Sequence, residues 1–328
     1  MTLNTKRRQV LVGTGLAAAM VGFPAIAKDK PKLRFSAVFS DQDIRAQMMK
    51  KFADGIKDDF VFEGFYGGTL FKQGTELVAL QRGNLEMSNI APQDMSKQLP
   101  AWSIVTAGYL FRDAAHVSKF FRSEEAAELK KMSEDKLGVK VLGPTYYGVR
   151  QLGLKPDRKI MTPADLKGIK LRMPAGDAWQ FLGRALGADP TPMAYAEVYT
   201  GLQTGAIDGQ DNPLPNVENM KFYEVMSQIV LTSHLVAFDL LTVTTKVWDQ
   251  MSPDTQKKFQ AAADSAMDFS TAKHLAREKE LADSFAEKGL KLYTPDLDAF
   301  RTHVQKEYLA SDLSKHWIPG MVDKINAL

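Results

Sequence analysis

Cysteine is absent from this chain of 328 residues, and histidine occurs only five times. The lack of cysteine excludes disulfide bonds, thiolate zinc sites, iron–sulfur clusters and cysteine nucleophiles. The chain also lacks an excess of one charge: three of its 42 basic residues lie together at positions 6–8, and the other 39 balance the 39 acidic residues. This balance excludes the basic surface that nucleic-acid binding requires, so we expect no nucleic-acid partner. With 45% hydrophobic residues, the chain is long and apolar enough for two compact domains.

Residues 1–27 have the three-part layout of an export signal peptide. The basic residues at 6–8 precede an apolar run rich in glycine and alanine, and the small residues Ala25 and Ala27 are typical of a cleavage site. We therefore expect cleavage near Ala27 and a mature chain that begins near Lys28. The paired Arg7 and Arg8 are typical of the twin-arginine export route, and the general secretion route is the alternative.

Two other interpretations of this segment are a dinucleotide-binding turn and a membrane anchor. The GTGLAA motif at 13–18 imitates the glycine-rich turn, but Gly22 and Pro24 would interrupt the helix that must follow it. The apolar run at 10–27 approaches the length of a membrane span, but it ends in the cleavage pattern. No later segment is as long without charges, so we expect the mature protein not to be embedded in a membrane.

Hydrophobic periodicity predicts a repeated α/β arrangement. Apolar residues alternate at 33–39, which predicts a strand, and recur at helical spacing at 44–56, before a second strand at 60–65. A helix at about 75–82 ends at Gly83, and a short strand follows at 84–90. The heptad LQRGNLE at 80–86 is similar to LQTGAID at 202–208, and each follows a helical stretch. The repeat indicates two α/β lobes of related topology.

Further strands at 139–143 and 149–154, joined through 146–148, and at 240–244 lie where we expect the chain to pass between the lobes. We predict lobe I at 28–148, with 238–252 returning to it, and lobe II at 149–237. A long helix at 253–290 has Ser252 as its N-cap and Gly289 after its end, and it is long enough to brace both lobes. Residues 291–328 form a C-terminal segment. The expected apolar stripe of the long helix consists of Phe259, Ala263, Ala266, Met267 and Phe269.

Motifs of catalysis are missing as well. The sequence contains no GxSxG elbow, HExxH motif, P-loop or cluster of histidines. We therefore expect a protein that is not an enzyme and that needs no cofactor or metal ion. A secreted α/β enzyme acting on an anionic substrate is the alternative.

The clearest candidate for chemistry is Arg172, in a predicted strand at 169–173. The apolar residues of this strand face one way, Lys170 and Arg172 face the other, and Pro174 ends the strand. A guanidinium fixed at a strand end can hold a carboxylate with two parallel hydrogen bonds, which lysine cannot reproduce. An exposed or salt-bridged arginine is the alternative. Arg150 places a second guanidinium at the predicted lobe crossing, and residues 208–213 form a polar, proline-terminated turn that contains Asn212.

Four stretches together resemble one protein family: KGIKLRMP at 167–174, GADPTPMAYAEVY at 187–199, LQTGAIDGQDNP at 202–213 and KFYEV at 221–225. They are similar to the substrate-binding proteins of tripartite ATP-independent periplasmic (TRAP) transporters, of the dicarboxylate-binding-protein type. The resemblance implies a two-lobed periplasmic-binding-protein-like fold that closes over a small organic acid and delivers it to a membrane permease from the periplasm. It implies that Arg172 clamps the solute carboxylate, that Arg150 assists this clamp and that Asn212 forms a hydrogen bond with the ligand. We expect a monomer, with an acid-sensing receptor subunit as a further alternative.

Other candidate ligand-binding residues are aromatic or polar. Asp239 is a candidate for a solute hydroxyl or amine, and Gln93 belongs to a first-lobe segment, 91–94, that differs from sialic-acid binders. Ala175 also replaces the asparagine that sialic-acid binders usually have, so sialate is disfavoured. Sugar acids, C4-dicarboxylates, 2-oxo or hydroxy acids and aromatic acids all fit one carboxylate clamp. The candidate pocket walls are Phe39, Tyr66, Tyr147, Trp179, Tyr195 and Phe238.

Overall fold

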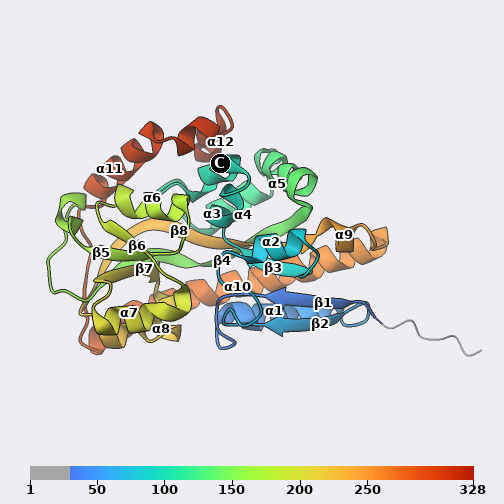
Figure 1. Cartoon of the computed structure of the whole chain (residues 1–328), viewed down its shortest axis with the longest axis horizontal. Coiled ribbons are helices and arrows are strands. Elements are labelled where there is room, and N and C mark those ends of the chain that lie inside the picture. Colours follow the sequence, from blue (N-terminus) through green and yellow to red (C-terminus); the bar gives the residue numbers. More distant parts are fainter. Residues whose placement is uncertain (1–29) are drawn as a thin grey trace, which may run out of the picture. The chain divides into compact units, whose positions relative to one another are not determined.

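The computed structural model describes residues 30–328, so the predicted export signal at 1–27 lies outside the described residues. Strands within this range form one mixed sheet, in the order β2-β1-β3-β8-β4-β7-β5-β6, with β9 beside β8 (Figure 1). The strands are β1 (Lys32–Ser36), β2 (Val61–Phe65), β3 (Met87–Ile90), β4 (Val139–Leu154), β5 (Lys170–Met173), β6 (Asp189–Pro192), β7 (Gly209–Pro213), β8 (Gln228–Thr244) and β9 (Lys291–Tyr293). The helices are α1 (Ile44–Ile56), α2 (Glu76–Gln81), α3 (Pro92–Ser96), α4 (Ala114–Phe121), α5 (Glu124–Leu137), α6 (Asp177–Ala185), α7 (Val198–Thr204), α8 (Leu214–Asn219), α9 (Thr245–Trp248), α10 (Pro253–Glu287), α11 (Leu297–Ala310) and α12 (Met321–Ala327).

The two ends of the sheet repeat one arrangement of three parallel strands. At the first end, β1 lies between β2 and β3, and at the second end, β5 lies between β6 and β7. One helix joins the first two strands of each set, and a short helix, α2 or α7, precedes the third. Gly83 and Gly205 follow these short helices with positive φ angles of 71° and 77°, the left-handed conformation that glycine adopts without strain. The prediction of two α/β lobes of related topology is confirmed.

Strands β4 and β8 join the two ends as a long antiparallel pair. The prediction of two separate strands at 139–143 and 149–154 was wrong, because β4 runs continuously from Val139 to Leu154. Its register shifts between Tyr146 and Gly148, where Gly148 has a φ of 126°. A Cβ atom at Gly148 would lie 2.5 Å from the Cβ of Pro213, so only glycine allows this irregular passage. Residues 31–328 form one unit of contacts, and the lobe boundaries remain a prediction.

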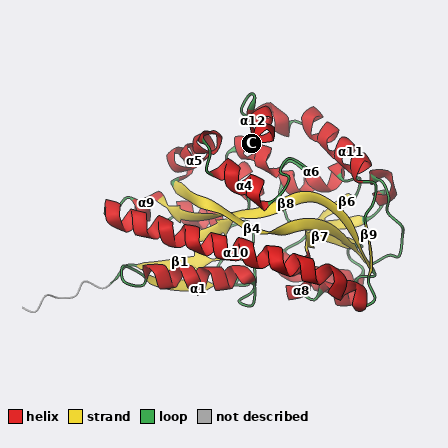
Figure 2. Cartoon of the chain, turned by 180° about the vertical axis from the view of Figure 1, so that it is seen from behind, coloured by secondary structure: helices red, strands yellow, loops and turns green. Residues whose placement is uncertain are grey.

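Helix α10 contacts both ends of the sheet region, because it packs against α1, β4 and α8 (Figure 2). Ser252 accepts a hydrogen bond from Thr255 N as the N-cap, as predicted. The ring of Phe259 packs edge-on against Phe52 of α1, with ring centroids 5.0 Å apart. The prediction for Phe269 was wrong: it is partly exposed, because the helical period from Phe259 leads to Ser270 instead.

The C-terminal segment covers the opposite side of the sheet from α10. Helix α11 contacts α6 and β8, and α12 contacts α5 (Figure 1). Phe300, Val304 and Tyr308 of α11 join the largest hydrophobic cluster, which also contains residues of α3, α4 and α5. The part of the chain that the structure describes contains no helix that is both long and apolar enough to cross a membrane.

Candidate functional site

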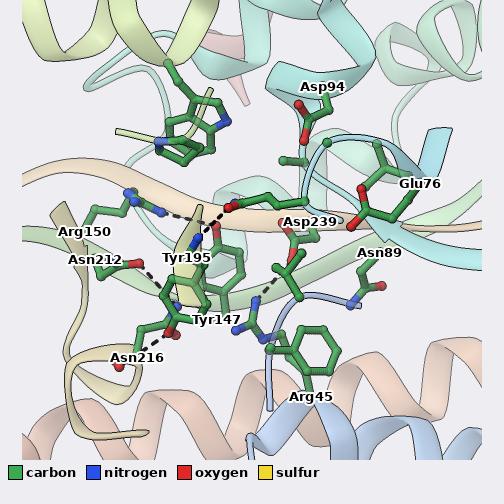
Figure 3. Close-up of a pocket in the computed structure, with 18 of the residues that line it drawn as sticks. Arg45, Glu76, Asn89, Asp94, Tyr147, Arg150, Tyr195, Asn212, Asn216 and Asp239 are labelled. Carbon is green, nitrogen blue, oxygen red and sulfur yellow. Dashed lines mark hydrogen bonds and ion pairs between the residues drawn. The ribbon is translucent and has the colours of Figure 1, made fainter. Parts of the chain in front are cut away.

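A cavity lies where side chains from both ends of the sheet meet (Figure 3). Eight of the eleven predicted site residues line it: Phe39, Tyr147, Arg150, Arg172, Trp179, Tyr195, Asn212 and Asp239. The other three do not. Tyr66 packs beside the rings of Phe35 and Phe39, while Gln93 and Phe238 line a smaller neighbouring cavity.

Arg172 reaches the cavity from the C-terminal end of β5, and only 1% of its surface is exposed. Its Nε donates to the carbonyl oxygen of Met193 at 2.9 Å, and its Nη2 donates to Gln73 Oε1 at 3.3 Å. Gln73 Oε1 also accepts from the backbone N of Tyr195 at 2.8 Å, so this side chain crosses the cleft from the loop before α2. Among residues 30–328, no carboxylate forms a salt bridge with Arg172. Burial lowers the pKa of Arg172 to about 10; the charge of Asp211 opposes this decrease and the charge of Arg150 adds to it.

Arg150 has a different environment, because an internal carboxylate occupies one edge of its guanidinium. Its Nε and Nη2 donate to the two carboxylate oxygens of Asp211 at 2.7 and 2.9 Å. His234 Nε2 lies 3.1 Å from Asp211 Oδ2, and burial lowers the pKa of His234, which therefore stays neutral. Burial opposes the ionised form of Asp211, but the Arg150 charge and the hydrogen bonds from His234 and Arg150 together outweigh burial and hold the pKa of Asp211 below its ordinary value. Arg150 keeps only Nη1, which is 3.4 Å from Tyr147 OH, away from Asp211.

Asn212 and Asp211 belong to strand β7, so the prediction of a turn at 208–213 was wrong. Gly209, Asp211, Asn212 and Pro213 are turn-forming residue types, but this segment pairs with β4 on one side and β5 on the other. All five residues of the strand are buried. Asn212 Nδ2 donates to Gln210 Oε1 at 2.6 Å, which fixes the amide at the cavity wall.

Sequence reasoning missed Arg45, which also lines the cavity. Its Nε and Nη2 donate to Asp43 at 3.0 and 2.8 Å, and its Nη1 donates to Asp239 at 3.1 Å. The guanidinium lies 4.3 Å from the ring centroid of Phe39 and 4.4 Å from that of Tyr147. A signal was present, since Arg45 lies on the face of α1 that buries Met48, Met49 and Phe52. Two carboxylates therefore surround one guanidinium, and Arg45 supplies no excess positive charge.

Several polar groups of the cavity have no partner among the described residues. Both amide atoms of Asn89 and the Oδ1 atom of Asn216 are buried without a hydrogen bond. Two acidic side chains of the cavity do have partners. Backbone N–H groups of Gly74, Thr75 and Glu76 itself stabilise the Glu76 carboxylate, but burial is the larger effect and raises the pKa of this carboxyl to about 7. Asp94 forms a salt bridge with Lys97 at 2.5 Å. Buried polar groups in folded proteins are normally paired, so the unpaired atoms of Asn89 and Asn216 indicate a polar ligand.

The side chains of this cavity can bind an anionic solute without changing it chemically. Arg172 is the one arginine of the cavity without a carboxylate partner among residues 30–328, and hydrogen-bonding side chains surround the space beside it. Within the same residues, no group of three or more potential metal-ligating side chains occurs. A buried cleft between two related α/β halves, with an unpaired guanidinium in its wall, defines a solute-binding protein.

Comparisons with known proteins identify the family. The model of bacterial extracellular solute-binding protein family 7 (DctP) matches residues 35–312, so the chain belongs to this family. The sialic acid-binding periplasmic protein of Vibrio cholerae is 31% identical over 236 residues, which cover 72% of this chain and 73% of the relative. The resemblance to TRAP solute-binding proteins is confirmed.

Solved structures agree with this assignment. A TRAP periplasmic solute-binding protein of Roseobacter denitrificans, with bound 3-deoxy-D-manno-oct-2-ulosonic acid (KDO), is 44% identical and has a TM-score of 0.90. The match covers 91% of this chain and 99% of that chain. A second protein of that organism, with bound L-galactonate, is 25% identical with a TM-score of 0.82, and the match covers 91% and 98% of the two chains.

Proposed function

We propose that this protein binds a sugar acid with a single carboxylate, through Arg172, and delivers it to the membrane permease of a TRAP transporter. The observation that carries the proposal is the buried Arg172 guanidinium without a carboxylate partner among the described residues. An incoming carboxylate would compensate this charge, which makes binding favourable where a neutral solute would leave the cation unsatisfied.

The identity of the solute as a sugar acid rests on two supports. KDO and L-galactonate, bound in the similar structures, each combine one carboxylate with several hydroxyl groups. In this chain, the unpaired amide of Asn89 provides a donor and an acceptor for such hydroxyl groups, and the unpaired Oδ1 atom of Asn216 provides a further acceptor. Arg150 and Tyr147 line the same cavity as Arg172, and Trp179 and Tyr195 supply aromatic surface.

Delivery to a permease fits an exported protein. The predicted signal with cleavage near Ala27 would release the mature chain into the periplasm, where the TRAP relatives are named as acting. Binding and release of an unchanged solute then require only opening and closing of the cleft. Gln73, which bonds to both Arg172 and Tyr195 across the cleft, is one contact that opening would break.

Isothermal titration calorimetry with KDO, L-galactonate and neutral D-galactose tests the proposal. We expect at least one acid to bind and D-galactose not to bind. Arg172→Ala should weaken binding by about 100-fold, as removal of one partner of a buried charge pair does, while the exposed control Arg82→Ala should have no effect. Binding of D-galactose at similar affinity, or unchanged binding by Arg172→Ala, contradicts the proposal. Conversion of either acid to a product, followed by NMR, would support the enzymatic alternative.

A further inference from the structure

The side of the cavity away from Arg150 and Asn212 carries a second set of polar groups. Glu76, the first residue of α2, and Asn89, in β3, both lie there (Figure 3). Both come from the first end of the sheet, whereas Arg172 comes from β5 at the second end. A solute held at Arg172 and long enough to cross the cleft would therefore place its far end beside Glu76 and Asn89.

Asn89 needs a ligand that both donates and accepts a hydrogen bond. Its Nδ2 and Oδ1 atoms are both buried, and neither has a partner among residues 30–328. A hydroxyl group donates one hydrogen bond and accepts others, so it can satisfy either atom. A carboxylate only accepts, and it would leave the Oδ1 atom unpaired.

Glu76 makes the same wall unfavourable for an anion. Its carboxyl is buried in the cavity wall, and Asp94 and Asp239 line the cavity as well. Asp94 already pairs with Lys97, and Asp239 shares Arg45 with Asp43. Apart from Arg172, every basic residue that lines the cavity in the described part of the chain is in an ion pair. A second carboxylate on this side would therefore have no cation to pair with, and its charge would be close to that of Glu76.

The ion pairs around the cavity agree. Three arginines line it, and Arg45 is paired with Asp43 and Asp239, while Arg150 is paired with Asp211. Of these three, only Arg172 has no salt bridge within the described part of the chain. A first solute carboxylate therefore meets an unpaired cation in the cavity wall, and a second one does not.

We propose that Glu76 and Asn89 are specificity-determining residues, which bind the hydroxylated far end of the solute and reject a second carboxylate there. This inference rests on the proposed function, in which Arg172 holds the first carboxylate. If it is right, the protein binds a sugar monoacid more tightly than a dicarboxylate of the same length.

Two commercial acids provide a matched pair of probes. L-galactonate and galactarate differ only at one end, where the first has a CH₂OH group and the second a carboxylate. By calorimetry at pH 8, we expect the wild-type protein to bind L-galactonate at least tenfold more tightly than galactarate. Glu76→Gln should reduce this preference at least threefold, mainly by strengthening galactarate binding, because it removes the negative charge and keeps the shape. If L-galactonate binds too weakly to measure, KDO serves as the monoacid.

Asn89→Ala supplies a second, independent variant. It should weaken binding of the monoacid three- to tenfold and change galactarate binding less, since only the hydroxylated end pairs with the amide. Matched controls are the exposed Glu128→Gln and Asn84→Ala, which should change neither affinity.

The outcomes separate the two proposals. If neither KDO nor L-galactonate binds the wild-type protein, the proposed function fails. If one of them binds but galactarate binds equally well, or if both the Glu76→Gln and the Asn89→Ala variants keep the wild-type preference, this inference alone is overturned. A circular dichroism melt of each variant verifies that it is folded.

Discussion

Replacement of Glu76 by glutamine should stabilise the protein in a way that depends on pH. The carboxyl is 4% exposed, and burial raises its pKa from 4.5 to about 7, with Asp94 adding to the increase. Between these two pKa values the native state binds more protons than the unfolded chain does, so stability falls as pH rises. The difference of pKa values corresponds to about 3 kcal/mol, fully expressed above pH 7 and reduced to about 1 kcal/mol at pH 5.

Glu76→Gln removes this cost because the amide does not ionise. Thermal melts of the ligand-free protein, followed by circular dichroism, should give a midpoint roughly 6 °C higher than that of the wild type at pH 8. The gain should shrink to roughly 2 °C at pH 5. Glu128→Gln, at an exposed position, controls for the general effect of losing one carboxylate. A variant that is no more stable than the wild type at pH 8, or equally stabilised at both pH values, would refute this reasoning.

Two further predictions concern the buried ion pair and the core. Asp211→Asn leaves the Arg150 charge buried without its carboxylate. We therefore expect the free energy of unfolding, measured in urea, to fall by about 3–5 kcal/mol, and sugar-acid binding to weaken. A decrease below about 1 kcal/mol would contradict the role given to Asp211. Phe259→Ala removes a ring that is 0% exposed and packs against Phe52, which should cost about 3–5 kcal/mol. Phe269→Ala, ten residues along the same helix but partly exposed, should cost much less, and equal costs would show that the assignment of the buried face is wrong.

Local patterns were sufficient for much of the fold. The helix at 44–56 has the predicted limits, because its apolar spacing lies within the segment and its N-cap, Asp43, directly precedes it. The repeated heptads also predicted equivalent helix ends at Gly83 and Gly205, because a left-handed C-terminal residue is a local requirement. Strand β7 could not be predicted in this way. Its residues favour turns when considered alone, and only pairing with β4 and β5 makes them a strand.

Some residues of the site could likewise be predicted from local sequence, and others could not. Arg172 could be found because its strand and the following proline are contiguous in sequence, and a family motif surrounds it. Asn89 and Glu76 gave no such signal, since a polar residue at a strand or helix position usually faces solvent. Their burial depends on β8, which lies more than 100 residues further along the chain and against which both β3 and α2 pack. The partner of Arg150 was also unpredictable, because Asp211 lies in the segment that resembled a turn.

A crystal structure of the complex with KDO or L-galactonate tests the central claim most directly. We predict a solute carboxylate oxygen at about 2.7–2.9 Å from a guanidinium nitrogen of Arg172, with Arg150 still bonded to Asp211 and Arg45 to Asp43. A solute whose carboxylate contacts Arg45 or Arg150 instead, while Arg172 keeps only Gln73 and Met193 as partners, would contradict the account.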